Sequence, residues 1–149
     1  MSAYLSNELA NTTTGLTTAA TTGYKPTSTN GYNSRLRRFR ATVTLASQTT
    51  NDTITLATLP SGTLFEYGVV NTDTSLGGSV LTLGITGSTA KYMGSAVFTT
   101  TNTPTLIGKT ATTGAASPFS SDETILATIA GAALPASGTL VVDLLVSAG

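Results

Sequence analysis

Few residues of this chain could carry out a chemical reaction. The sequence contains no histidine and no cysteine, which removes the usual general base near neutral pH, thiolate nucleophiles and ordinary zinc sites. Ser88 and Lys91 match the S-x-x-K spacing of Ser/Lys acyl-transfer enzymes. That chemistry needs the serine at a helix start and two partner motifs, and the chain shows neither. We therefore expect this segment to be a loop, without a nucleophile.

The acidic residues form no clear catalytic or metal site. Asp122 and Glu123 are adjacent, so on an extended chain they would point to opposite faces. Glu66 and Asp143 lie in strand-like segments and could meet in space as glycosidase chemistry requires, but pairing with Arg or Lys is the simpler interpretation. Asp73 is the single acid of NTDTS, too few for a strong calcium site. We expect no enzymatic activity, no cofactor and no metal.

The composition favours one β-rich domain. The chain has 149 residues, 7 of them basic and 7 acidic, so it carries no net charge that would favour nucleic acid or a membrane surface. Charged residues make up only 9% of the chain, against about 25% in an ordinary soluble domain. Roughly a fifth of the residues are threonine, which is β-branched and suits a pleated sheet.

No segment suggests a membrane span or an export signal. Apolar stretches stay shorter than the roughly 20 residues that cross a bilayer. The start, MSAYLSNELANTTTGL, lacks the basic residues and apolar run of a signal peptide. We expect a protein that is made in a cytoplasm and not directed to Sec-type export.

Residues 1–34 differ from the rest and predict an extended, partly flexible N-terminal arm. They are rich in Thr, Gly, Asn and Ser, without a helical period or clean alternation. A disordered tail would explain this composition. Tyr4, Tyr24 and Tyr32 favour an arm that orders against a neighbour, because aromatic residues are rare in linkers and enriched at interfaces.

The one cluster of charge is RLRRFR (35–40), with Arg35, Arg37, Arg38 and Arg40. Arginines at a strand edge can simply be solvated and block unwanted pairing. They can also dock onto an acidic protein surface, where arginine is favoured. A phosphate backbone is a third possibility, but a neutral chain without a broad basic face argues against nucleic acid. Together with the three tyrosines, these arginines are our candidate partner-interface residues.

Residues 35–149 read as a succession of short strands. Alternation in RFRATVTLAS places Phe39, Ala41 and Val43 on one face. Further strands are expected at TITLAT, 63–70, 79–86, AVFTT, PTLIG, ETILATIA and TLVVDLLV, with the polar stretch GSTAKYMGSA as a loop. About eight strands with turns between them predict an all-β domain, a β-sandwich or jelly-roll-like fold.

Two stretches repeat one pattern. LPSGTL (59–64) and LPASGTL (134–140) each join two apolar segments. We expect two similar hairpins, with Pro60 at the second position of a type I turn and Gly138 at positive φ. The strand after Gly138 is apolar on both faces, which predicts burial on both and a covering contact from another subunit.

From residue 35 to 147 the order of segments resembles small structural proteins of tailed-phage virions, the decoration or cement type that coats capsids. The likeness rests on NDTITLATLPSGTLFEYGVV, SLGGSVLTLGI, AKYMGSAVF and ETILATIAGAALPASGTLVVDLLV. The resemblance implies a protein made in the host bacterial cytoplasm and located on the capsid surface of the virion. It implies the major capsid protein as partner, with self-association as a homotrimer or homodimer. The alternatives are a tail, neck or fibre-anchoring domain of the virion, or a carbohydrate-binding module, against which the lack of tryptophan counts.

Overall fold

Alternating apolar and polar residues account for where most strands form. The computed structural model describes residues 36–108 and 118–148. Among these residues there is no helix that is long and apolar enough to cross a membrane. Their strands are β1 (Leu36–Thr44), β2 (Thr53–Leu59), β3 (Thr63–Thr72), β4 (Val80–Ile85), β5 (Ser88–Val97), β6 (Thr105–Gly108), β7 (Glu123–Ala130) and β8 (Thr139–Ala148).

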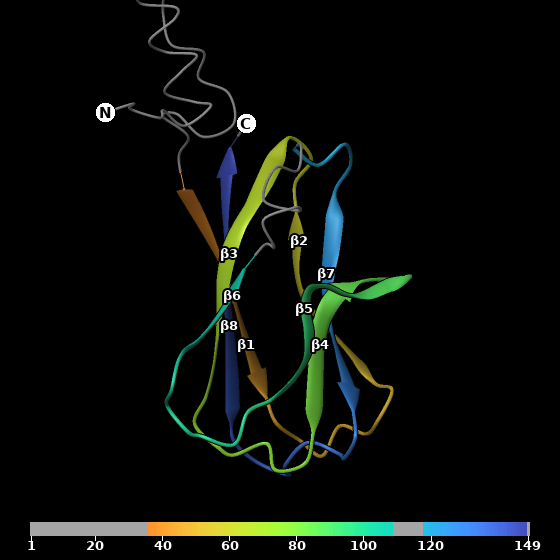
Figure 1. The fold of residues 1–149 in the computed structure, drawn as a ribbon, viewed down its shortest axis with the longest axis vertical. Helices are drawn as coiled ribbons and strands as arrows, with labels where there is room; N and C mark the ends of the chain where they lie inside the picture. Colours follow the sequence, from red (N-terminus) through yellow and green to blue (C-terminus); the bar gives the residue numbers. More distant parts are fainter. Residues whose placement is uncertain (1–35, 109–117, 149) are drawn as a thin grey trace, which may run out of the picture.

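The strands form two antiparallel layers (Figure 1). Sheet A has the order β1-β8-β3-β6 and sheet B the order β2-β7-β4-β5. The strand pairing is nested: the first strand pairs with the last, and each following pair lies inside the previous one. The pairs are β1 with β8, β2 with β7, β3 with β6 and β4 with β5. This is one long antiparallel ribbon folded over itself, a jelly-roll-like sandwich. The prediction of an all-β sandwich is confirmed.

The core lies between the inner faces of the two sheets. On β8, Leu140, Val142, Leu144 and Val146 are each at most 1% exposed, because every second residue of a strand points to the same face. The Phe65 ring of β3 meets a ring from β5 edge-on across the two layers, with centroids 4.6 Å apart. Residues from both sheets form one continuous apolar cluster within the described part of the chain.

The repeated LPSG and LPASG stretches are corners between sheets, and the prediction of two hairpins is wrong. β2 and β3 belong to different sheets, as do β7 and β8. Because β2 and β7 run antiparallel, their two corners lie at opposite ends of the sandwich. The Pro60 carbonyl accepts a hydrogen bond from the Thr63 amide at 3.4 Å, so Pro60 is the first residue of its turn and not the second. Gly62 and Gly138 both have positive φ, at 77° and 123°, which confirms the prediction for Gly138.

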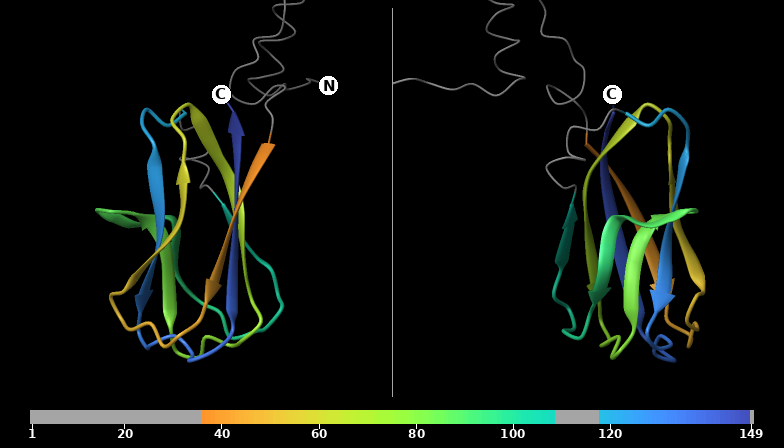
Figure 2. Two further views of the ribbon diagram at one scale, coloured as in Figure 1. Left: turned by 180° about the vertical axis from the view of Figure 1, so that it is seen from behind. Right: turned by 45° about the vertical axis from the view of Figure 1, so that its right-hand side comes forward.

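The segment that we expected to be a loop, GSTAKYMGSA, is most of strand β5. It pairs with β4 through a register that shifts twice, and most of its residues are exposed, which explains why alternation is weak there. The tip of the β4–β5 hairpin projects from the body of the sandwich in both views of Figure 2. Gly84 permits the fold-back, since a Cβ there would lie 2.1 Å from the Ser88 carbonyl oxygen.

Candidate interaction surface

The arginine cluster lies at the edge of sheet A. Arg37, Arg38 and Arg40 are exposed residues of β1, the outermost strand of that sheet. The other candidate residues, Tyr4, Tyr24, Tyr32 and Arg35, lie outside the described residues. The contact of this cluster with a partner stays a prediction.

Arg40 is engaged within its own sheet. It lies directly opposite Asp143 of β8 and donates from Nε and Nη2 to the two carboxylate oxygens, both at 2.7 Å. These hydrogen bonds, helped by the charges of Arg40 and Arg38, lower the pKa of Asp143 below its ordinary value near 3.8. The simpler interpretation of Asp143, pairing with an arginine, is confirmed. The bidentate pair fixes β1 onto β8 across the outward side of the sheet.

The outward side of sheet A carries an apolar surface. The register aligns Arg38, Leu145, Tyr67 and Gly108 in one row across the four strands, and Arg40, Asp143, Val69 and Leu106 in the next. We call this surface, with Leu36 and Val141, the outer face of sheet A. Apart from Arg38 and the neutralised Arg40–Asp143 pair, it contains no charged side chain from these rows.

Three of the four large apolar side chains exposed among the described residues lie on this face. They are Leu106 at 70%, Leu36 at 52% and Tyr67 at 37% exposure, whereas Val97 at 54% lies on sheet B. The apolar outward residues of β8, Val141 and Leu145, are half-buried. Burial of β8 on both faces is therefore partial in the single chain. That another subunit covers the remainder stays a prediction.

A second cluster, which the sequence did not suggest, joins Lys91, Tyr92 and Glu123. Lys91 Nζ lies 2.5 Å from Glu123 Oε1 and 5.7 Å from the Phe119 ring centroid, and the Tyr92 hydroxyl donates to the other carboxylate oxygen. Burial, followed by the hydrogen bond and the negative charge of Glu123, raises the pKa of Tyr92. These contacts attach β5 to the start of β7, and the S-x-x-K residues Ser88 and Lys91 lie in a strand rather than at a helix start.

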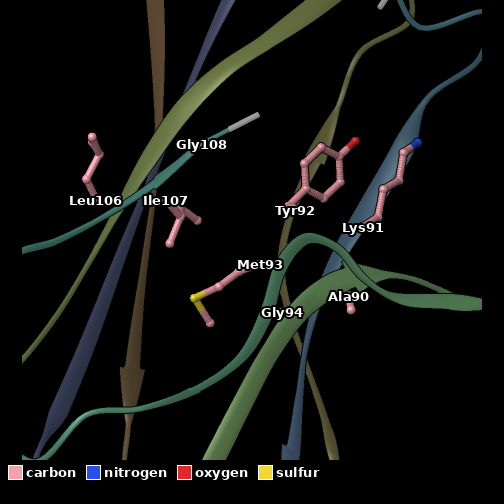
Figure 3. Close-up of a pocket in the computed structure, with 8 residues that line it drawn as sticks. All are labelled: Ala90, Lys91, Tyr92, Met93, Gly94, Leu106, Ile107 and Gly108. Atoms are coloured by element: carbon pink, nitrogen blue, oxygen red, sulfur yellow. The ribbon is translucent and has the colours of Figure 1, made fainter. Parts of the chain in front are cut away.

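A groove separates β5 and β6, which are edge strands of different sheets among the described residues. It is lined by residues 90–94 of β5 and 106–108 of β6. Met93 and Ile107 point toward the space between the two strands, whereas Leu106 points away from it (Figure 3). The lining is mainly apolar, with Lys91 and Tyr92 at one end, and it brings together no pair of carboxylates.

The remaining acids serve as local acceptors. Asp122 accepts the Ser61 amide, Asp73 accepts the Thr139 amide, and Glu66 accepts the Ser147 hydroxyl. Glu66 and Asp143, which glycosidase chemistry would require as a pair, are thus engaged by different partners. Within residues 36–108 and 118–148, no three His, Cys, Asp or Glu side chains are grouped so as to hold a metal ion.

Comparison with known proteins identifies the fold. No family model matches the sequence, and no curated protein matches it. A chain of the cyanophage Pam1 capsid asymmetric unit superposes with a TM-score of 0.64 at 14% identity, covering 86% of this chain and 95% of that one. A chain of the Ralstonia phage GP4 capsid gives 0.60 at 15% identity, covering 88% and 94%.

A third structure, the acid-stable capsid of Helicobacter pylori bacteriophage KHP30, gives a TM-score of 0.50 at 13% identity, covering 76% of this chain and 92% of that one. In each case nearly the whole of the other chain is matched, so the likeness extends over the complete sandwich and not over a shared fragment. The chain thus has an eight-stranded β-sandwich fold that is also found in chains of phage capsids.

Proposed function

We propose that this chain is a structural virion protein, a decoration or cement protein that binds the outer surface of a phage capsid and stabilises the shell. The observation that carries the proposal is the apolar outer face of sheet A, on a fold shared with capsid chains. No enzymatic step belongs to this function.

The physical character of this face supports a role in covering area. Burying exposed apolar side chains such as Leu106, Tyr67 and Leu36 is favourable, at roughly 25 cal/mol for each Å² removed from water. The two charges on β1 and β8, Arg40 and Asp143, already neutralise each other, so docking would leave neither of them unpaired. A sheet face of this kind can therefore dock on another protein without stranding an unpaired charge at this pair.

Arg38 supports an acidic counterpart on the partner. It lies on the same face as the apolar residues, next to Leu145 in the register, and its charge acts on Asp143. An acidic residue at the rim of the major capsid protein's docking site would pair with it. Arginine in such a position adds orientation and association rate more than affinity.

Self-association and the N-terminal segment extend the same proposal. A homotrimer or homodimer would present several copies of the outer face at once, and avidity would rise without a single strong contact. Residues 1–34 with Tyr4, Tyr24 and Tyr32 form, in this proposal, an arm whose free parts order on docking, at an entropic cost that the added contacts must exceed.

The test is binding to shells assembled from the major capsid protein that is encoded with this chain. We expect saturable binding, with a copy number that follows the shell lattice, and a higher temperature of shell disruption once the chain is bound. Association with purified tails alone would assign the chain to the tail or neck. Binding to neither shells nor tails would refute a virion role of this kind.

A further inference from the structure

The groove between β5 and β6 lies between two edge strands, one from each sheet. β5 is the last strand of sheet B and β6 the last strand of sheet A, so each has a hydrogen-bonded neighbour on one side only among the described residues. An edge strand presents a row of unpaired backbone N–H and C=O groups, which is a template for one more strand. β6 is only four residues long, Thr105–Gly108.

Two glycines keep the groove open. A Cβ added at Gly94 of β5 or at Gly108 of β6 would meet nothing within 4 Å. Elsewhere in the same sheets glycine is required by close packing, as at Gly68, where a Cβ would lie 2.7 Å from the Asp143 carbonyl oxygen. Glycine in a strand interior weakens it and often marks a place where another backbone approaches closely. Both open glycines line this groove.

The side chains at the groove suit an added strand beside β6. Its inward side chains would cover the partly buried Met93, which points into the space between the strands beside the buried Ile107 (Figure 3). Its outward side chains would lie beside Leu106, which is 70% exposed and has a neighbour in sheet A on one side only, Val69 of β3. The added strand would thus be the fifth of sheet A.

From these observations we infer that residues 11–22 of the same chain add to the free edge of β6 as a fifth strand of sheet A. This segment, NTTTGLTTAATT, contains no proline and no charged residue and is mostly threonine and alanine. Its small β-branched side chains suit a narrow groove, and its backbone can donate to and accept from the edge.

The length of the chain permits this arrangement. β1 begins at Leu36 and β6 ends at Gly108, and the strand order and directions place these two ends at the same end of sheet A. They are separated by three strand spacings, about 14 Å at roughly 4.8 Å each. The 13 residues from 23 to 35 can extend over about 43 Å at roughly 3.3 Å each. A tether of this length gives the segment a high effective concentration at its own β6.

Hydrogen exchange of the β6 amides tests the inference. We compare the full chain with a chain that starts at residue 35, which retains both sheets and the apolar cluster between them. We expect the amides among residues 105–108 that face away from β3, which are every second one, to exchange at least about tenfold more slowly in the full chain, because an added strand would engage them. Adding a synthetic peptide of residues 11–22 to the shortened chain should restore the slow exchange. Equal exchange in the two chains would overturn the inference.

A variant of the full chain separates docking in the groove from general stability. Gly94→Val places a side chain in the groove at a site with open space and without positive φ, so the sandwich tolerates it. We expect exchange at residues 105–108 to rise to the rate of the shortened chain. Ser95→Val, one residue further on β5 and outside the groove lining, is the matched control and should leave exchange slow. Slow exchange that persists in Gly94→Val would refute the assignment.

The source of the strand is distinguished by concentration. Protection by the chain's own segment is independent of protein concentration, whereas protection that appears only as the concentration rises would assign the strand to a second copy and overturn the inference. Shell binding by the Gly94→Val variant separates this inference from the proposed function. If the variant loses protection at β6 yet still binds shells through the outer face of sheet A, the two are independent.

Discussion

The outer face of sheet A can be tested at its most exposed residue. Leu106 is 70% exposed in the single chain, and the register places it beside Val69 on that face. We expect Leu106→Ser to weaken binding to capsid shells. Since so little of the side chain is buried in the isolated domain, its free energy of unfolding should change by less than about 1 kcal/mol.

The size of the effect follows from the area that remains to be buried. Complete burial of a leucine side chain is worth about 1.5–3 kcal/mol, and 70% of the Leu106 side chain is available. Docking that covers it therefore contributes about 1–2 kcal/mol per site. At 1.4 kcal/mol for each factor of ten, the dissociation constant for one site should rise by about 5- to 30-fold. Several linked sites would multiply the loss.

Titration of shells with fluorescently labelled protein measures the dissociation constant. The matched control is Val97→Ser, because Val97 has a comparable exposure of 54% but lies on β5 of sheet B. We expect Val97→Ser to bind as the unchanged chain does. An unchanged dissociation constant for Leu106→Ser, or an equal loss in both variants, would refute the assignment of the docking face to sheet A.

Three further predictions concern stability. Gly84→Ala should lower the free energy of unfolding by about 1–3 kcal/mol, because its Cβ would clash with the β5 backbone, whereas Gly94→Ala should leave that free energy nearly unchanged. Urea unfolding measures both values, and equal effects of the two substitutions would contradict the clash. The pKa of Asp143 is lowered by Arg40, so the free energy of unfolding should fall as pH drops below about 4 through the folded-state pKa. Asp143→Asn should flatten this part of the plot of unfolding free energy against pH, and an unaltered slope would contradict the prediction. The pKa of Tyr92 is raised by burial and Glu123, so the free energy of unfolding should decline as pH rises above about 10. Thermal unfolding at alkaline pH should show a smaller decline for Tyr92→Phe, and an equal decline in the two proteins would contradict the prediction.

Local patterns in the sequence predict the strands well where one face is buried and the other is wet. β1 alternates Phe39, Ala41 and Val43 with exposed polar residues, and β8 repeats apolar residues at every second position. β5 was missed because it stands partly away from the sandwich and has little to bury. Gly84 of β4 and Gly94 of β5 meet the requirements of the fold-back and of the groove, which no local pattern reveals.

Long-range pairings could not be predicted from the sequence. Arg40 and Asp143 are 103 residues apart, and Lys91 and Glu123 are 32 apart, so neither pair has a spacing that marks it. The LPSG and LPASG stretches show the same limit. Proline and glycine predict a turn correctly, but a corner between sheets and a hairpin within one sheet use the same residues. Only the pairing of β2 with β7 and of β3 with β8 decides between them.

The central claim is that this sandwich functions by covering a protein surface with the outer face of sheet A. An electron cryo-microscopy map of capsid shells saturated with the chain tests it most directly. We predict density for the sandwich on the shell exterior, with β1, β8, β3 and β6 facing the capsid protein and Leu106 at the contact. Density in which sheet B faces the shell, or shells that carry no added density at saturating protein, would contradict the claim.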